Sequence, residues 1–322
     1  MPQLLFERLN EQDRNFRPDF ALNSTLSWIH GLSILMGSED FSKEELQRKY
    51  SGIQRTSSTK SSETTVMSSL FMAINYLASL SVLKEIKSNV NDLARISIIS
   101  WYYGIFHSAN AMLVATNRDF IPDNHTNTAN VWDDLIAKHD LIPAPFSYRV
   151  SSLIEAEYKG EIESNKDYST TQLAHFYPQN KQQAKSACLS YLKGTASYLN
   201  WKKESEIKES KEFRDLGVSD FRTKKARELR DVKLKRHSCC FLHQASRYRG
   251  KANYRDSIYL GYGDNNPNLL NFTDDLFIVL KTFINVVFYY SSKRLEKELF
   301  TSFIEDLKKH SNLSISIDSL VN

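Results

Sequence analysis

The residue types best suited to phosphate chemistry gather in one segment, residues 221–256. This segment holds twelve Lys or Arg and three Asp or Glu, a net charge of +9, whereas the rest of the chain carries −5. An excess of charge confined to one stretch is typical of a protein that binds a polyanion. Within it, the pairs Arg236–His243 and Arg230–His237 each place an arginine two helical turns before a histidine.

A helix over residues 233–256 would sort these side chains onto two faces. One stripe would be polar and able to contact phosphate: Arg236, Cys240, His243, Arg247 and Tyr254. The opposite side would be apolar or aromatic and would face the core: Phe241, Ala245, Tyr248, Ala252 and Tyr259. The spacing therefore predicts a packed helix that presents a basic stripe.

The pair Arg236 and His243 is our predicted catalytic pair, and its chemistry would be cleavage of RNA. A neutral histidine can accept the proton of a 2′-hydroxyl, and an arginine can stabilise the charge that develops on the phosphate. One histidine cannot easily serve as both base and acid, so a symmetric dimer would supply the second. The alternative is a solvated basic helix face that binds without cutting.

Other chemistries find little support. No GxxxxGK[ST] or GxGxxG phosphate loop and no GxSxG elbow occurs, and no His, Cys and carboxylate spacing suggests a metal site. The three cysteines, Cys188, Cys239 and Cys240, suggest neither a disulfide framework nor a zinc site, so we expect a reducing cytoplasm. We predict no cofactor.

The elements that must position these residues are helices. Glycine and proline together make up about 5% of the chain, against about 12% in average usage, which disfavours folds with many tight turns. Apolar periodicity predicts helices over 68–86, 91–117, 128–139, 146–159, 181–203 and 272–309. No segment alternates with period two, so the expected class is all-α. Residues 51–69 are rich in Ser and Thr and suggest a linker or exposed loop.

Two apolar segments resemble membrane spans but are better explained as buried helices. Residues 96–115 contain Trp101, two tyrosines, His107 and Asn110, and residues 277–290 are short and interrupted by Lys281. The N-terminus lacks the basic start and long apolar run of a signal peptide. We therefore predict no membrane association.

Residues 95–138 resemble a pattern of the HEPN superfamily, namely an Arg, an aromatic YYAxFHAA stretch, a loop, and a His before an apolar helix. The matching residues are Tyr102, Tyr103, Phe106, His107, His125, Val131 and Trp132. The family's R-x-x-A-D-Y motif has a counterpart in Arg249, Ala252, Asn253 and Tyr254, with Asn in place of Asp.

The resemblance implies an antiparallel helical bundle over residues 61–310, with an insertion at about 140–220. Residues 1–60 would be an N-terminal extension with the linker, and 311–322 a C-terminal tail. A second alignment instead uses residues 155–158 and 181–203 for the last two core helices.

Many members of this family cleave RNA without a metal, are usually dimeric, and act in toxin–antitoxin or antiviral systems. Others have lost catalysis and bind RNA, a nucleotide, or a partner such as a nucleotidyltransferase. The resemblance therefore predicts RNA, a second copy of the chain and a cognate antitoxin or nucleotidyltransferase as partners.

Further site residues follow from the basic stretch and the resemblance. We predict RNA contacts by Arg247, Arg249, Lys251 and Tyr254, although Arg249 and Tyr254 could instead anchor neighbouring helices. Tyr103, His107 and His125 would line a cleft that faces the basic helix. Tyr103 and His107 could alternatively belong to the core, and His125 could cap the helix that follows it.

Overall fold

The computed structural model describes residues 4–12, 18–56, 59–165, 168–169, 173, 176–253, 258–262 and 266–321. Helices dominate these residues, which confirms the predicted all-α class. Besides the helices, the described residues form one small antiparallel sheet, in which β1 (Arg149–Val150) pairs with β2 (Cys239–Cys240). Arg149 lies opposite Cys240 in this ladder.

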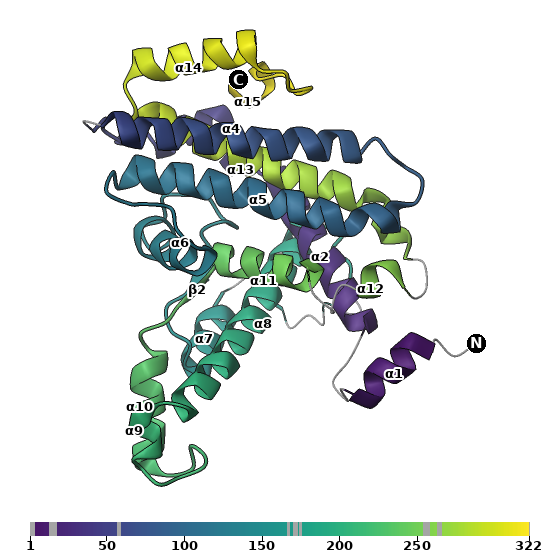
Figure 1. The fold of residues 1–322 in the computed structure, drawn as a ribbon, viewed down its shortest axis with the longest axis vertical. Helices are drawn as coiled ribbons and strands as arrows, with labels where there is room; N and C mark the ends of the chain where they lie inside the picture. The colour runs from purple at the N-terminus through teal and green to yellow at the C-terminus, as the bar shows by residue number, and fades with distance from the viewer. Residues whose placement is uncertain are drawn as a thin grey trace.

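Three long helices lie side by side and form the main layer of the bundle: α4 (Lys60–Leu83), α5 (Val90–Thr116) and α13 (Phe272–Arg294) (Figure 1). The predicted helix over 91–117 is confirmed as α5, which is buried along most of its length. A Cβ atom on Gly104 of α5 would lie 2.5 Å from Leu280 Cδ2 of α13. The close approach of these two helices therefore depends on a glycine at this position.

An aromatic core joins the main layer to α2 (Pro18–Met36), α8 (Lys181–Lys208) and α11 (Phe241–Asn253). Trp28 of α2 stacks on Tyr191 of α8 with ring centres 4.1 Å apart. Trp101 of α5 and Tyr248 of α11 meet Trp28 edge to face, at 5.8 and 4.9 Å. Helix α2 thus packs inside the core, although residues 1–60 were expected to form an extension.

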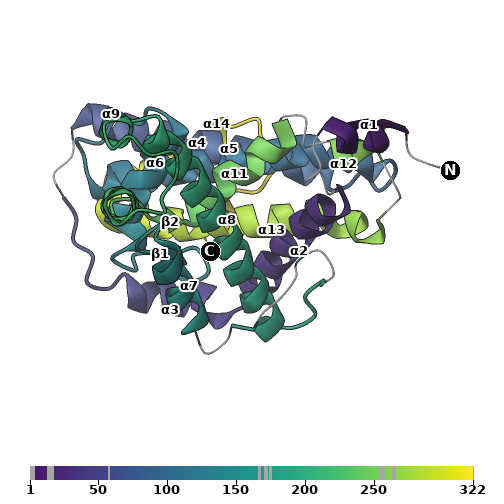
Figure 2. The same ribbon diagram turned by 90° about the horizontal axis from the view of Figure 1, so that it is seen from below.

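A helical arm projects from the bundle and consists of α7 (Glu155–Glu163), most of α8, α9 (Lys211–Arg214) and α10 (Lys224–Leu234) (Figure 1). The arm has a small core of its own, which includes Tyr158, Leu192, Phe213 and Leu234. Seen from below, α8 runs across the bundle beside α2 (Figure 2). The arm lies mainly within residues 140–220, the range expected to be an insertion, and continues beyond it into α10.

Shorter elements complete the described chain: α1 (Leu4–Gln12), η1 (Glu39–Phe41), α3 (Lys43–Lys49), α6 (His125–Trp132), the π-helical turn η2 (Asp133–Ala137), α12 (Ile258–Gly261), η4 (Pro267–Asn271), α14 (Lys297–His310) and α15 (Asp318–Val321). The predicted tail at 311–322 folds back, because Ile317 and Leu320 are buried in the core.

Three predicted boundaries are wrong. The helix expected over 272–309 is interrupted at Leu295, where an extended residue separates α13 from α14. The linker expected over 51–69 is shorter, because Thr59 caps α4 through a reciprocal hydrogen bond with Ser62. The helix expected over 146–159 is replaced by turns, β1 and α7.

The two apolar segments singled out in the sequence are buried parts of α5 and α13. Among the described residues, α4 is instead the one helix whose length and composition would allow it to cross a membrane. A core helix passes the same test, and Val66, Leu70 and Leu77 of α4 are fully buried within the hydrophobic core.

Candidate functional site

The predicted catalytic pair does not form on one helix. Helix α10 ends at Leu234, β2 follows at Cys239–Cys240, and α11 begins only at Phe241. Arg236 therefore lies exposed in the connection, whereas His243 lies in the first turn of α11. The prediction that Arg236 and His243 share one helical stripe is wrong. The apolar face is confirmed on α11: Phe241, Ala245, Tyr248 and Ala252 are buried.

The alternative pair is also separated. Arg230 lies in α10, where its guanidinium contacts Glu204 at 3.5 Å and Asp231 at 2.8 Å. His237 lies in the connection beyond that helix. Arg230 is thus engaged by carboxylates of the arm.

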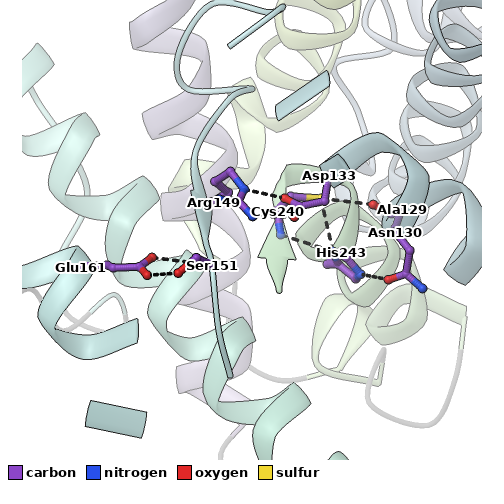
Figure 3. A network of polar contacts seen from close by, with 8 residues as sticks. All are labelled: Ala129, Asn130, Asp133, Arg149, Ser151, Glu161, Cys240 and His243. Atoms are coloured by element: carbon purple, nitrogen blue, oxygen red, sulfur yellow. Dashed lines mark hydrogen bonds and ion pairs between the residues drawn. The ribbon is translucent and has the colours of Figure 1, made fainter. Parts of the chain in front are cut away.

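Both ring nitrogens of His243 are occupied by the protein itself (Figure 3). The backbone N–H of Cys240 donates to His243 Nδ1 at 3.2 Å. Nδ1 is then the unprotonated nitrogen, and Nε2 donates to Asn130 Oδ1 at 3.1 Å. Burial lowers the pKa of His243 to about 4. The ring is therefore neutral, but its lone pair is already used and cannot serve as a general base.

A buried ion pair lies next to His243 (Figure 3). Asp133 of η2 accepts two hydrogen bonds from Arg149 of β1, at 2.9 and 2.8 Å, and is almost fully buried. The Sγ of Cys240 lies 3.5 Å from the carbonyl of Ala129, and burial raises the pKa of its thiol to about 12. Together, these contacts tie α6, η2, the sheet and α11 into one structural unit.

A second cluster lies where α11 meets α5. The guanidinium of Arg249 sits over the ring of Tyr102 at 5.1 Å and near that of Tyr103 at 6.0 Å. Its Nη1 donates to the hydroxyl of Tyr103 at 3.4 Å. Arg249 Nε is buried without a hydrogen-bond partner, and no carboxylate among the described residues forms an ion pair with Arg249.

One histidine, His125, borders Arg249. His125 is the first residue of α6, and the preceding Asn124 supplies the cap, so His125 is not the capping residue. Its ring lies 5.2 Å from that of Tyr102 and 4.5 Å from that of Phe106. Its Nδ1 is buried and makes no hydrogen bond.

His107 completes the group on the α4 side. Its ring stacks on Tyr76 of α4 at 5.8 Å, and Tyr76 also stacks on Tyr103 at 5.7 Å. We call the complete set the aromatic–histidine cluster: Tyr76, Tyr102, Tyr103, Phe106, His107, His125 and Arg249. The cluster unites all three predicted cleft residues with one predicted RNA contact. Tyr76 was missed, because no spacing in the sequence reveals the register between α4 and α5.

The electrostatics of this cluster keep both histidines neutral at neutral pH. Burial lowers the pKa of His107, and the neighbouring His125 lowers it further. Burial also lowers the pKa of His125, with an additional contribution from the Arg249 cation. Burial raises the pKa of Tyr102 to about 12, so its hydroxyl stays protonated.

The remaining predicted RNA contacts lie on the other edge of α11. Arg247 Nη1 donates to Thr195 Oγ1 of α8 at 3.3 Å, and its guanidinium lies 4.7 Å from the centre of the Tyr198 ring. Lys251 Nζ lies 5.8 Å from the centre of the Tyr191 ring, also on α8. Tyr254 falls outside the described residues. The basic residues of α11 are therefore divided between two surfaces.

A third polar group consists of Ser33, His30 and Asp275. Its hydrogen bonds do not connect the serine to the histidine, as activation of a serine nucleophile would require. Asp275 accepts from Ser33 Oγ at 2.6 Å and contacts His30 Nδ1 at 2.9 Å. The serine thus faces the carboxylate rather than the imidazole that would have to deprotonate it. In the part of the chain that the structure describes, no three His, Cys, Asp or Glu side chains are placed to hold a metal ion.

No family model, curated protein or solved structure matches this chain. The aromatic–histidine cluster offers a partly buried cation without a carboxylate partner, two neutral imidazoles and a phenol. This combination is suited to binding an anion and to moving protons next to it.

Proposed function

We propose that the chain is an RNA-directed endoribonuclease of the HEPN type that works without a metal, with its reaction centre at the aromatic–histidine cluster. The supporting observation is the guanidinium of Arg249, which is partly buried and lacks a carboxylate partner within the described ranges. It adjoins neutral His125, and neutral His107 lies next to His125 in the cluster. A desolvated charge without a counter-ion is costly. A phosphate group would remove that cost.

The chemistry follows from these groups. Neutral His125 accepts the proton of a 2′-hydroxyl, and the 2′-oxygen forms a bond to the adjacent phosphorus. The bond from phosphorus to the 5′-oxygen breaks, and that oxygen takes a proton from protonated His107. The products are a 2′,3′-cyclic phosphate and a 5′-hydroxyl. Arg249 stabilises the negative charge on the non-bridging oxygens with its paired donors.

His107 takes its proton from solvent when the anionic substrate binds, and the charge on that ring then disfavours a second proton on the neighbouring His125. A phosphate bound beside Arg249 would raise the pKa of both histidines and so oppose the effect of the cation. Because the two histidines come from one chain, a second copy is not needed to complete the reaction. Dimerisation, a role as a toxin or antiviral effector in the cytoplasm, and pairing with a cognate antitoxin or nucleotidyltransferase remain part of the proposal.

A second candidate is a module that binds RNA or a nucleotide without cutting it. It is favoured by the packing of the histidine rings, since Tyr76 stacks on His107 and Phe106 lies against His125. Rings held this closely have little freedom to shuttle protons. Under this alternative, Arg249 supplies affinity only.

Cleavage of RNA in EDTA by the purified chain separates the two candidates. We expect the wild-type chain to cut, His125→Gln to lose roughly 10²–10⁴-fold in rate while still binding RNA, and Arg249→Lys to lose both rate and affinity. His310→Gln is the matched control, because His310 is exposed on α14. A wild-type chain that binds RNA but never cuts it would establish the binding module instead.

A further inference from the structure

A pair of aromatic side chains is exposed on α8, where the arm leaves the bundle. Trp201 is 63% exposed and Tyr198 is 40% exposed, and their ring centres are 6.1 Å apart at an angle of 34°. The other three tryptophans, Trp28, Trp101 and Trp132, are essentially inaccessible. A single exposed aromatic residue is ordinary, but two neighbouring flat rings form a platform.

A cation completes this platform. The guanidinium of Arg247 lies 4.7 Å from the centre of the Tyr198 ring and is held there by the hydroxyl of Thr195. Arg247 is only partly buried, and within the described residues no carboxylate forms an ion pair with it. Its positive charge is therefore available to an anion that approaches the rings.

The carboxylates closest in sequence to Trp201 are already engaged. Glu204 contacts Arg230 at 3.5 Å, and Glu206 contacts Lys203 at 2.7 Å. Lys202, next to Trp201, is exposed to solvent. Among the sequence neighbours of Trp201 on α8, the charge that is not neutralised is thus positive, which favours a polyanion over an apolar partner.

The surface beside the rings is also open. A Cβ atom on Gly194 would have only the tip of Arg247 as a neighbour, at 4.0 Å, and one on Gly250 would have none within 4 Å. Gly194 lies one turn before Tyr198 on α8, and Gly250 lies on α11 between Arg247 and Arg249 in helical rotation. Small residues on both helices therefore leave a flat ligand room to lie against the cation and the rings.

We propose that Trp201, Tyr198 and Arg247 form a stacking site for the unpaired bases of single-stranded RNA. Aromatic rings bind any base through its flat face, and an adjacent arginine pairs with the backbone phosphate. The choice of RNA rests on the proposed function, whereas the stacking site itself does not. Duplexes are excluded, because their bases are already stacked and cannot lie on the rings.

Fluorescence of the intact chain tests the site directly, since Trp201 is the exposed tryptophan and a stacked base quenches it. Eight-residue oligouridine and oligoadenosine should quench saturably, and less so as salt rises. A duplex of the same length should not quench. Equal quenching by duplex and single strand would overturn stacking.

Variants are compared by the anisotropy of a labelled oligonucleotide. We expect Trp201→Ala to bind roughly 5- to 150-fold more weakly, as loss of one stacked base implies, and Trp201→Phe to recover most of that loss. Arg247→Gln should weaken binding and flatten the salt dependence. Val82→Ala and Lys297→Gln, at exposed positions on α4 and α14, are the matched controls. Unchanged affinity of Trp201→Ala would refute the proposal.

Oligodeoxynucleotides separate this proposal from the proposed function, because they have no 2′-hydroxyl and cannot be cleaved by the same route. If oligoribonucleotides and oligodeoxynucleotides both bind, and both depend on Trp201, the stacking site is supported and its restriction to RNA is overturned. Tighter binding of the oligoribonucleotide would support both the stacking site and its restriction to RNA. Binding dependent on Trp201 in a chain that never cuts RNA would retain the stacking site while the nuclease fails.

Discussion

Arg247 and Arg249 leave α11 on opposite sides. Arg247 reaches α8 and lies over Tyr198, whereas Arg249 reaches α5 and lies over Tyr102. Two residues along a helix correspond to a rotation of roughly 200°, so the two cations border one half-buried strip that includes Ser246 and Gly250. A strand of RNA lying across that strip could contact the stacking site at one edge and the aromatic–histidine cluster at the other.

The first prediction concerns the coupling between Arg249 and His125. Because the Arg249 cation lowers the pKa of His125, Arg249→Gln should raise that pKa. The value should stay below the ordinary 6.5, since burial is the larger cause. Titration of the histidine ring signals by NMR measures both values. Arg247→Gln, on the other edge of α11, should leave the His125 titration unchanged.

The second prediction concerns His243 and the dependence of stability on pH. The folded chain holds this ring neutral down to a pKa of about 4, whereas the unfolded chain protonates it near 6.5. The unfolded state therefore binds more protons between these values, and the free energy of unfolding falls as pH drops from 6.5 to 4.

His243→Asn lacks this titration, so the stability gap between wild type and variant should shrink between pH 7.5 and pH 4.5. Urea denaturation at the two pH values measures it. A gap that stays constant would show that His243 is not held neutral.

The third prediction concerns the buried ion pair. Asp133→Asn removes the carboxylate from a nearly inaccessible site and leaves the Arg149 guanidinium without its counter-ion. Loss of one partner of a buried pair costs about 3–5 kcal/mol of unfolding free energy. Chemical denaturation should show this loss. Glu155→Gln breaks an exposed pair with Lys159 and should change the stability little.

The fourth prediction concerns the contact between α5 and α13. In Gly104→Ala the new methyl group would collide with Leu280, which is fully buried and cannot move into solvent. Overpacking of this kind costs about 1–3 kcal/mol. Gly160→Ala is the control, because its Cβ would meet nothing in α7 and alanine favours a helix. Equal stability of the two variants would contradict the close approach of the helices.

Much of the fold could be predicted because apolar periodicity is a local signal. Helices α5 and α8 lie within a few residues of their predicted starts, since each is long and strongly patterned. The two-residue strands around Val150 and Cys239 could not be predicted, because pairing between distant segments leaves no periodicity in so short a stretch. Trp28 likewise lies in a sequence that gives no sign of its partners in α5 and α8.

The site was predicted only where its residues lie within one pattern. Tyr103, His107, His125 and Arg249 were singled out, and the fold brings them together. Arg236 and His243 were placed together by assuming one continuous helix, and the turn before β2 separates them. The predicted helix covered residues 233–256, but Cys239 and Cys240 instead pair with β1 and are buried there, a contact that local spacing does not reveal.

The burial of all three cysteines makes this chain suitable for site-directed labelling. Cys188, Cys239 and Cys240 are inaccessible, and burial raises the pKa of each thiol, so none should react with maleimides in the folded state. A thiol introduced by Gly250→Cys would point into open space on the strip between Arg247 and Arg249. A spin label or photo-crosslinker attached there would report, without further mutation, which molecule lies across α11.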